Sequence, residues 1–561
     1  MSNTGRIIGI DLGTSTSEVA CIVDGKPVII PNKNGKLVTP SVIHIAEDGS
    51  EFIGEFAAEY LLISPERTFM EVKRLMGADE ILRVDSRVFT PEALQAKLLR
   101  YLADCAETYL GEKIEGAVIT VPAYFTDSQR RATAKAGELA GLQVKRILNE
   151  PTAAAMDYGL NNLSECKYIL VYDFGGGTLD ITVLELFEGV IDVKASCGDN
   201  HLGGKDFDEV IMRELADVRN DARALMRLKK AAEECKIALS GDEQHSVSLP
   251  LLYTNKKGRP VSIERTITRS EFEGWVADKV ESTRKPMMRA LSDAKLLPRQ
   301  LDLVLLVGGS TRIPCVRQLV SETLGLDLKP LIDPELAVAR GAAVQAGIME
   351  GSLAEGKKLV LTDVSPFTLG IATMMEGFFD DRLVFLPIIP RNTTIPTERS
   401  HIVTPYRDYQ TQVEVRAYQG DSSDPEQNEF LGKVMLTGIP SAKKGKEPIE
   451  VKFSYDMNGI LQVNAKAISN NSEVSAEINT AGAKAKPMID LSKWEEAEGA
   501  RRFRPVIRKA DKLISANAVA ADDLELLVNR AKEALLLGDH DQAAELREEI
   551  MELINMIEAF E

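Results

Sequence analysis

The sequence lacks the features that mark disulfide-stapled, zinc-binding and membrane-spanning proteins. Its six cysteines have no close pair; they lie at positions 21, 105, 166, 197, 235 and 315. Scattered cysteines of this kind indicate reduced core residues rather than disulfides or metal ligands. No apolar run approaches the roughly 20 residues needed to span a bilayer, and stretches such as Leu303 to Val307 are typical of buried strands. The apolar run Ile7 to Ile10 ends at Asp11, which argues against a signal peptide.

Basic residues are outnumbered, 67 against 85 acidic ones, which gives a net charge of −18. Such a surface repels phosphate backbones, and we noted only short basic pieces such as Lys443, Lys444 and Lys446. We therefore expect no nucleic-acid or membrane partner and a cytoplasmic location. The 44% hydrophobic and 27% charged residues are ordinary for globular proteins and exclude a disordered chain. A length of 561 residues predicts about three to four domains.

Three kinds of pattern follow one another along the chain. From about 5 to 355, strand-like runs around Ile7, Ile119 and Val304 alternate with helical stretches at 93–109 and 127–140, which predicts an α/β architecture. From 364 to about 480 the period becomes two, with an Asn458-Gly459 turn between alternating runs, which predicts hairpins in a β-sandwich. Beyond Pro487 the pattern becomes helical. Its apolar positions are Leu546, Ile550, Leu553, Ile554 and Ile557, and Gly538 is expected to end the preceding helix.

An internal repeat is the most informative feature. Residues 9–19, GIDLGTSTSEV, align with residues 172–181, YDFGGGTLDI. The alignment places Asp11 on Asp173, Gly13 on Gly175, Thr16 on Thr178, Glu18 on Asp180 and Val19 on Ile181. Each copy has an apolar strand, an Asp at its end, a glycine-rich turn and a return strand. Two duplicated lobes that face each other across a cleft would explain the repeat.

Glycine-rich turns let backbone N–H groups approach phosphate oxygens. Two such turns could clamp a polyphosphate, and Mg²⁺ would then compensate for Asp11 and Asp173. The alternative is a tight hairpin with a polar cap, which does not require an Asp at the same place twice. Two weaker glycine pairs lie in 304–314 and 201–208; in the first, Arg312 could stack on a flat ring. Neither a Rossmann nor a P-loop motif occurs in its strand-to-helix context.

These motifs, together with VITVPAYFTDSQRRAT at 118–133 and LNEPTAAAMDYGL at 148–160, resemble those of the 70-kDa heat-shock (DnaK-type) chaperones. The resemblance covers about residues 6–480 and, more weakly, the tail. It implies a two-lobed actin-like ATPase domain at 1–357, a linker at 358–364, a β-sandwich at 365–486 that grips extended apolar peptides, and a short helical tail at 487–561. ATP binding would open the peptide site and hydrolysis would close it. A sugar kinase or a filament-forming ATPase on the same fold stays open as an alternative, although either leaves the sandwich unexplained.

The resemblance also assigns residues. Catalytic roles go to Lys73, Glu150, Asp173 and Thr178, and Asp11 and Asp173 would hold Mg²⁺ through water, with K⁺ as an optional further cation. The ATP or ADP contacts are Gly13, Thr14, Ser15, Thr16, Gly175, Gly176, Gly177, Gly203, Gly204, Glu233, Lys236, Ser240, Gly308, Gly309, Ser310 and Arg312. The allosteric residues are Pro122, Arg130, Leu359, Leu361 and Asp363, and the peptide groove comprises Ile371, Met374, Val403, Tyr406, Val413 and Val415. Read without the family, Lys73 is a solvated lysine, Glu150 a helix cap and the groove residues ordinary core.

Several departures from the family pattern indicate a specialised member. Ser15 and Thr16 replace the usual first-turn residues, Glu335 stands where an Asp is usual, and the stretch between Gly77 and Thr90 is short. Residues 377–387 lengthen the sandwich, and the tail after Pro487 is expected to be too short for a full lid. These traits resemble the short bacterial HscC-type branch. Expected partners are extended client polypeptides and a J-domain co-chaperone, while dependence on an exchange factor stays open.

Overall fold

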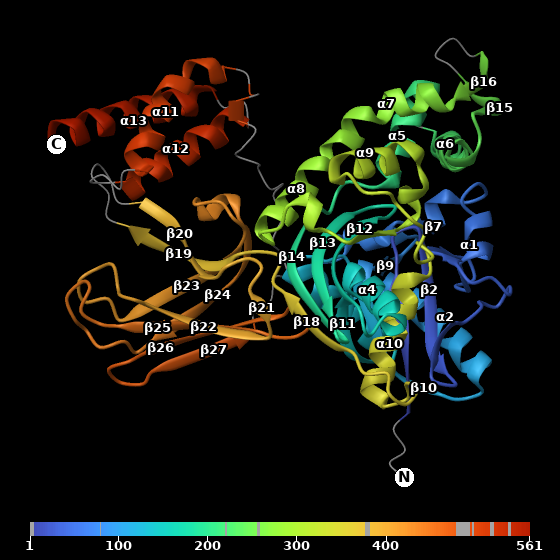
Figure 1. The fold of residues 1–561 in the computed structure, drawn as a ribbon, viewed down its shortest axis with the longest axis horizontal. Coiled ribbons are helices and arrows are strands. Elements are labelled where there is room, and N and C mark those ends of the chain that lie inside the picture. The colour runs from blue at the N-terminus through green and yellow to red at the C-terminus, as the bar shows by residue number, and fades with distance from the viewer. Residues whose placement is uncertain are drawn as a thin grey trace. The chain divides into compact units, whose positions relative to one another are not determined.

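The computed structural model describes residues 5–78, 80–218, 221–254, 259–375, 382–477, 494, 495, 497, 499–515, 521–536 and 540–560 (Figure 1). The chain forms two compact units. The first comprises Met1–Pro366, Asn392–Pro396 and Asp456–Ile460. The second comprises Phe367–Arg391, Thr397–Tyr455 and Leu461–Glu561.

The first half of unit one is built on a mixed sheet. Its strands lie in the order β11 (Gln143–Asn149), β10 (Ile114–Val121), β1 (Arg6–Leu12), β2 (Thr16–Val23) and β3 (Lys26–Ile29), and β4 (Thr39–Pro40) pairs with β2. The strands β11, β10 and β1 are parallel, whereas β1, β2 and β3 form an antiparallel meander. Helices α2 (Pro91–Leu110) and α3 (Asp127–Leu139) pack on this sheet and confirm the two predicted helices. Leucines 94, 98, 99 and 102 of α2 share a core with Ile8 and Ile10 of β1.

The second half repeats this arrangement. Its sheet has the order β17 (Leu303–Val307), β12 (Cys166–Phe174), β13 (Leu179–Phe187), β14 (Val190–Asp199), β18 (Val360–Val364) and β21 (Thr394–Ile395). Here β12, β13 and β14 form the meander, and β17 runs parallel to β12 as β10 does to β1. One core includes residues of α4 (Glu150–Asn161) and α10 (Ala337–Glu350), and another lies among the second-half helices. The predicted α/β alternation and the internal repeat are therefore confirmed in the topology.

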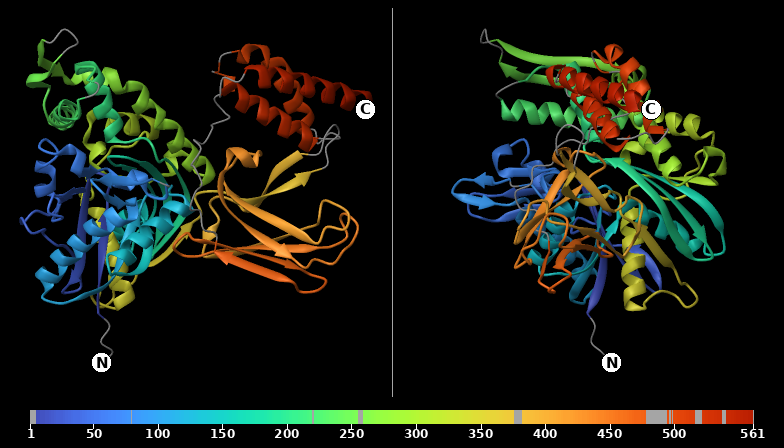
Figure 2. Two further views of the ribbon diagram at one scale, coloured as in Figure 1. Left: turned by 180° about the vertical axis from the view of Figure 1, so that it is seen from behind. Right: turned by 90° about the vertical axis from the view of Figure 1, so that its left-hand side faces the viewer.

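Smaller elements complete unit one (Figure 2). The strands are β5 (Val42–Ile45), β6 (Glu51–Ile53), β7 (Thr68–Met70), β8 (Leu82–Val84), β9 (Arg87–Phe89), β15 (Gln244–Thr254) and β16 (Pro260–Thr268). The helices are α1 (Glu55–Glu59), α5 (Gly204–Leu215), α6 (Ala222–Gly241), α7 (Arg269–Ser282), α8 (Arg284–Asp293) and α9 (Pro314–Leu324), with the 3₁₀ turns η2 (Val72–Leu75) and η4 (Gly309–Arg312). The short stretch before Thr90 contains the small hairpin β8–β9.

Unit two contains two four-stranded antiparallel sheets and a group of helices. The first sheet is β20 (Arg382–Ile389), β19 (Leu369–Met375), β23 (Gln412–Gln419) and β24 (Glu429–Thr437). The second is β22 (Thr397–Val403), β25 (Ile449–Tyr455), β26 (Leu461–Ala467) and β27 (Glu473–Glu477). Alternate residues of β25 and β26 are buried, and the two strands pair on either side of the Asn458-Gly459 turn, so the predicted hairpin is confirmed. Gly459 has a φ of 71°, which a glycine adopts without strain.

The tail helices are α11 (Arg504–Ser515), α12 (Ala521–Leu536) and α13 (His540–Phe560). They share a core that buries all five predicted apolar positions of α13, while Gly538 lies outside the described residues. Two sequence interpretations are wrong. Cys166 is exposed at the start of β12 rather than buried in a core, and a basic cluster was overlooked around α11. Its residues are Arg501, Arg502, Arg504, Arg508, Lys509 and Lys512.

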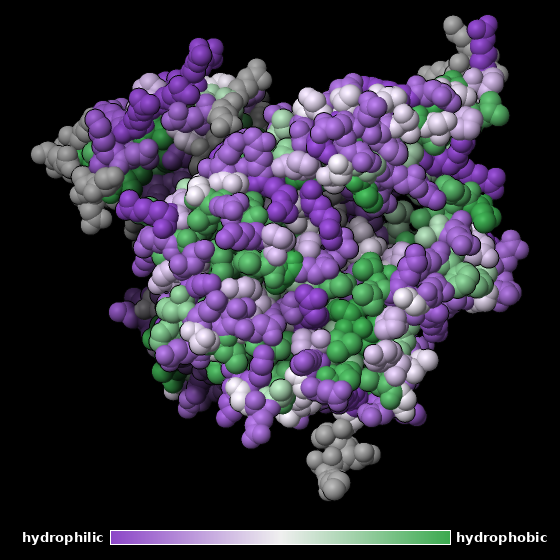
Figure 3. All heavy atoms as spheres, turned by 45° about the vertical axis from the view of Figure 1, so that its right-hand side comes forward, coloured by the Kyte–Doolittle hydropathy of each residue, from purple (hydrophilic) through white to green (hydrophobic). Residues whose placement is uncertain are grey.

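The face drawn in Figure 3 mixes hydrophilic and hydrophobic residues. Exposed large apolar side chains on unit one include Phe56, Ile63 and Leu251. Among the described residues, we find no helix long and apolar enough to cross a membrane.

Candidate functional site

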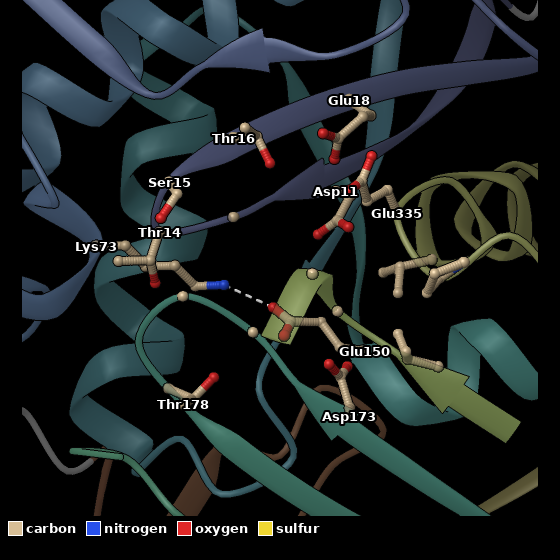
Figure 4. A pocket seen from close by; sticks show the side chains of 18 residues that line it. Asp11, Thr14, Ser15, Thr16, Glu18, Lys73, Glu150, Asp173, Thr178 and Glu335 are labelled. Carbon is tan, nitrogen blue, oxygen red and sulfur yellow. Dashed lines mark hydrogen bonds and ion pairs between the residues drawn. The ribbon is translucent and has the colours of Figure 1, made fainter. Parts of the chain in front are cut away.

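The strand ends of the two repeated sheets line one cleft of about 550 Å³ in unit one (Figure 4). The turn after β1 and the turn after β12 supply its walls, and Gly308 and Gly309 follow β17 at its edge. Lys73 enters from η2 and Glu150 from the first residue of α4. The lining residues are Asp11, Gly13, Thr14, Ser15, Thr16, Glu18, Lys73, Glu150, Asp173, Gly175, Gly176, Thr178, Val307, Gly308, Gly309, Pro334, Glu335 and Val338.

Glycines of the two repeated turns lie where an added side chain would meet close neighbours. A Cβ on Gly176 would lie 2.3 Å from the Ser15 Oγ atom. A Cβ on Gly13 would lie 2.0 Å from the Thr16 carbonyl oxygen, within its own turn. Gly203 packs against the back of the second turn, where a Cβ would lie 2.5 Å from the Gly177 nitrogen. The glycines of the two turns therefore leave backbone exposed to the cleft, beside the side chains of Thr14, Ser15 and Thr16.

Lys73 and Glu150 form a buried ion pair in this cleft. Lys73 Nζ lies 2.6 Å from Glu150 Oε1, and the residues are 3% and 8% exposed. The ammonium group also lies 5.5 Å from the centre of the Phe125 ring. Since Lys73 is the one basic residue in the lining, it is the positive charge available to an anion in this cleft.

The carboxylates of the cleft are closely grouped. Burial, followed by the Glu150 charge, raises the pKa of Asp11 to about 7, and Thr120 donates a hydrogen bond to Asp11 at 2.9 Å. The same two causes raise the pKa of Asp173 well above its usual value. Asp173 Oδ2 is buried and has no hydrogen-bond partner. A hard cation with its water shell suits these oxygens, so the residues present are compatible with Mg²⁺.

A glycine-rich edge closes the other end of the cleft. Ser310 donates a hydrogen bond from Oγ to the Gly175 carbonyl at 2.8 Å. Arg312 lies beside it and pairs with Glu335, with Nε and Oε1 3.2 Å apart. Here the structure places Gly308, Gly309, Ser310 and Arg312 together, as the sequence analysis expects.

The predicted residues of α5 and α6 lie behind this lining. Lys236 Nζ is 2.8 Å from Asp208 Oδ1 and donates to the Gly204 carbonyl at 3.1 Å. Glu233 pairs with Lys205 at 2.8 Å, and Ser240 donates from Oγ to the Lys236 carbonyl. The Gly204 amide donates to the Gly175 carbonyl at 3.0 Å. Gly203, Gly204 and Lys236 thus brace the second turn, and Gly177 belongs to that turn although it is outside the lining.

Two ion pairs between the halves of unit one were missed from the sequence. Arg74 donates from Nη2 to Asp206 Oδ2 at 3.1 Å and to the Gly177 carbonyl at 3.3 Å. Lys229 Nζ lies 2.7 Å from Glu71 Oε1. These partners are 132 and 158 positions apart along the chain, so no local pattern indicates them. They join η2, next to Lys73, to the helices that support the second turn.

The predicted linker is a strand in the second sheet. Residues Val360, Leu361 and Thr362 of β18 pair with β14 in parallel. Leu359 is buried in the core shared with α4, and Leu361 packs against that core. Asp363 is buried; it accepts hydrogen bonds from Asn149 Nδ2 at 3.0 Å and Thr152 Oγ1 at 3.2 Å. Burial raises the pKa of Asp363.

Arg130 connects this linker to the segment that follows β10. Its Nη2 atom donates to Asn149 Oδ1 at 2.7 Å and to the Ala123 carbonyl at 2.9 Å. Its Nε atom donates to the Phe125 carbonyl, and the Phe125 amide donates to the Pro122 carbonyl. The structure therefore brings together Pro122, Arg130 and Asp363 through one hydrogen-bond network.

The predicted peptide residues lie in unit two but do not all share one face. Val413 and Val415 are two residues apart on β23, and Ile371 pairs with Ala417 of the same strand, so alternation puts the three on one face. Ile371 and Val415 are each 3% exposed. The odd spacing of Met374 from Ile371 puts Met374 on the opposite face, where it is 36% exposed. The other two predicted residues are Val403, in the second sheet, and Tyr406, whose ring lies 4.3 Å from Lys444 Nζ.

Comparison with known proteins places this geometry in one family. Residues 7–558 match the family model described as Hsp70 protein. The chain is 46% identical over 480 residues to the chaperone proteins DnaK of Thermotoga petrophila and Thermotoga maritima, which covers 84% of this chain and 79% of each relative. DnaK of Thermotoga neapolitana matches to the same extent. The match runs through both repeated turns, the linker strand and the sheets of unit two, and the chain belongs to the Hsp70 family.

Proposed function

We propose that the cleft binds ATP with Mg²⁺ between the two repeated turns and that its hydrolysis controls peptide binding by unit two. As an Hsp70 protein the chain is an ATP-dependent molecular chaperone and an ATP hydrolase. The observation that carries the residue assignment is the pair of matched turns, which face each other with a buried Lys73–Glu150 pair beside them. We also propose that unit one is a two-lobed actin-like domain and that the two sheets of unit two form a β-sandwich.

Each group in the cleft has a role that its chemistry supports. Backbone N–H groups of both turns would bind phosphate oxygens, because glycines leave them accessible. Mg²⁺ would be held through water by Asp11 and Asp173 and would neutralise phosphate charge. Lys73 would stabilise the negative charge that develops on the terminal phosphoryl group, and Glu150, Asp173 and Thr178 would orient the attacking water.

The adenosine end would lie against Gly308 and Gly309, where no side chain blocks a flat ring. Ser310, Arg312, Glu233, Lys236 and Ser240 would provide its polar contacts. In the ligand-free structure Arg312 is paired with Glu335, and Lys236 with Asp208. These two carboxylates would orient the basic side chains so that each can also contact the nucleotide.

The cleft would be coupled to the linker strand β18 through two consecutive residues. Glu150 lies in the cleft and pairs with Lys73, whereas its neighbour Asn149 binds Asp363 of the linker strand and Arg130. A movement of Glu150 upon nucleotide binding is therefore transmitted to Asn149 through the peptide bond. We propose that this step decides whether β18 stays paired with β14.

Client recognition would use the first sheet of unit two. Ile371, Val413 and Val415 share an apolar face, and an extended peptide would place an apolar side chain there and form main-chain hydrogen bonds. Met374, Val403 and Tyr406 would border the bound peptide. We also propose a J-domain co-chaperone as partner, a cytoplasmic location and membership of the specialised HscC-type branch, with the need for an exchange factor left to experiment. A sugar kinase or a filament-forming ATPase would leave both sheets of unit two without a role.

One experiment tests the coupling. A fluorescently labelled, extended apolar peptide is bound to the full chain without nucleotide, and its release is followed after ATP and Mg²⁺ are added. We expect ATP to accelerate release and the peptide to stimulate single-turnover hydrolysis. A release rate that ATP leaves unchanged would refute the coupled-chaperone proposal. A groove variant that no longer binds peptide should keep basal hydrolysis but lose its stimulation by peptide.

A further inference from the structure

Two connections cross from one sheet of unit two to the other at the same end of both sheets. The first crossover, residues 404–411, joins β22 to β23, and the second crossover, residues 438–448, joins β24 to β25. In the second sheet the last residue of β22 pairs with the first residue of β25. In the first sheet the first residue of β23 pairs with the last residue of β24. The two crossovers therefore begin and end beside each other.

Main-chain hydrogen bonds join the two crossovers along their length. The Tyr409 amide donates to the Ala442 carbonyl at 2.7 Å, and the Gly445 amide donates to the Pro405 carbonyl at 3.2 Å. Tyr409 has a φ of 59°, in the left-handed region that a bulky residue rarely adopts. Such a conformation persists only where neighbouring residues hold it. The crossovers therefore form one surface in a defined arrangement, whose side chains are placed before any ligand arrives.

This crossover surface is basic, although the chain as a whole has a net charge of −18. Its exposed basic residues are Arg407 of the first crossover and Lys443, Lys444 and Lys446 of the second. Lys444 Nζ lies 4.3 Å from the centre of the Tyr406 ring. In the part of the chain that the structure describes, no carboxylate forms an ion pair with Arg407, Lys443 or Lys446. These three side chains are therefore available to a negatively charged partner.

Two carboxylates in the crossovers offset this charge only in part. Asp408 Oδ1 accepts a hydrogen bond from the Lys444 main-chain amide at 2.8 Å, so this exposed carboxylate is already engaged within the surface. Glu447 is buried and accepts a hydrogen bond from Ser469 Oγ, so its charge does not face solvent. Four basic side chains thus stand against one exposed carboxylate.

The crossover surface adjoins the proposed peptide groove. The first crossover follows Val403 directly and leads into β23, which carries Val413 and Val415. Tyr406, which would border the bound peptide, belongs to this crossover and lies against Lys444. A client segment anchored in the groove by an apolar side chain would therefore have flanking residues within reach of the basic side chains.

We propose that this chain selects client segments in which the apolar anchor is flanked by acidic residues. The inference rests on the proposed function, because it uses the same groove, and it adds the class of client. Carboxylates of the flanking residues would pair with Arg407, Lys443 and Lys446. An exposed ion pair changes an affinity by up to about fivefold, so two or three such pairs together would give about tenfold.

The test compares fluorescent peptides that share one apolar core of leucine and valine. Their flanks on both sides consist of glutamates, glutamines or lysines, and anisotropy titrations with the full chain without nucleotide give the affinities. We expect the glutamate-flanked peptide to bind about tenfold more tightly than the glutamine-flanked one at low salt, and the lysine-flanked peptide to bind most weakly. The differences should shrink in about 1 M NaCl, where the Debye length is about 3 Å.

Replacing two exposed lysines of the second crossover isolates their part in this preference. The double variant Lys443→Gln with Lys446→Gln should reduce the preference for glutamate flanks to about twofold and leave binding of the glutamine-flanked peptide unchanged. The matched control is Lys433→Gln with Lys452→Gln, which removes two charges from surface ion pairs within the sheets of unit two. The control should keep the full preference.

Two results would overturn the inference. They are equal or weaker binding of the glutamate-flanked peptide compared with the glutamine-flanked one, and a preference for glutamate flanks that the double lysine variant retains in full. If either occurs while ATP still accelerates release of the glutamine-flanked peptide, the proposed chaperone cycle stands. Failure of all three peptides to bind would refute both the client class and the groove.

Discussion

Replacing Lys73 by Met tests the chemistry and the electrostatics of the cleft together. Methionine keeps a long side chain but removes the ammonium group, which lies 2.6 Å from Glu150 Oε1 in a position only 3% exposed. Loss of a preorganised group that stabilises transition-state charge costs about 10²–10³-fold in kcat, or about 3–4 kcal/mol. We expect a loss of this size in single-turnover ATP hydrolysis, with ATP still bound through the backbone of both turns.

The same substitution leaves Glu150 buried without its partner. Removing one member of a buried ion pair costs about 3–5 kcal/mol of stability, so nucleotide-free Lys73→Met should unfold at lower denaturant concentration. Adding Glu150→Gln should restore much of this stability without restoring hydrolysis. The control is Lys97→Met: Lys97 pairs with Glu51 at 2.5 Å on the surface, where a pair contributes about 0–1 kcal/mol. It should leave hydrolysis unchanged.

A hydrolysis rate unchanged in Lys73→Met, measured with ATP bound, would remove Lys73 from the chemistry. A stability loss no larger than that of Lys97→Met would show that the buried Glu150 carboxylate does not depend on Lys73 for stability. The two readouts are independent, because one follows labelled ATP and the other the folded fraction.

Three further outcomes follow from the structure. Because the pKa of Asp11 is raised to about 7, this carboxyl holds a proton in the folded nucleotide-free chain that it releases in the unfolded chain between about pH 4 and 7. The contribution of Asp11 to the free energy of unfolding should therefore fall as pH rises through this range, by at most about 4 kcal/mol. Asp11→Asn should reduce the slope in denaturant titrations, to which Asp180 with a pKa also raised to about 7 still contributes, and an unchanged slope would contradict the assignment. Gly203→Ala should weaken ADP binding measured by calorimetry, because its Cβ would lie 2.5 Å from the second turn, while Gly274→Ala, which meets nothing within 4 Å, should bind ADP normally. Asp363→Ala should keep basal ATP hydrolysis but lose its stimulation by peptide, whereas Val360→Ala, exposed on the same strand, should keep both; retained stimulation in Asp363→Ala would argue against the linker path.

Much of the candidate site was predictable because its signals are local. A strand, an Asp, a glycine-rich turn and a return strand lie within a dozen residues, and their repetition identified both walls of the cleft before any tertiary contact was known. The Asn458-Gly459 hairpin and the helical tail were predictable for the same reason, since period and turn chemistry are properties of neighbouring residues.

What the sequence did not indicate depends on distant partners. The Arg74–Asp206 and Glu71–Lys229 pairs need the halves of unit one to be folded together before they exist. Glu18 aligns with Asp180 in the repeat, but the amides that reach each carboxylate depend on tertiary contacts. The Tyr124 amide donates to Asp180 Oδ1, whereas Glu18 Oε1 is buried without a hydrogen-bond partner. Cys166 is exposed because it is the first residue of β12, and this strand becomes buried only further along.

The parallel pairing of β18 with β14 covers one edge of β14, which would become exposed if the linker strand left the sheet, as proposed above. While β18 is in place, the main chain of Val190, Ile191 and Asp192 is satisfied by a neighbouring strand. Once β18 departs, β14 becomes the border of the second sheet, and its amide and carbonyl groups face water or any extended segment that arrives. Sheet borders of this kind recruit other strands. In the proposed released state, unit one would therefore expose an unpaired strand edge at which a second copy of the chain could pair.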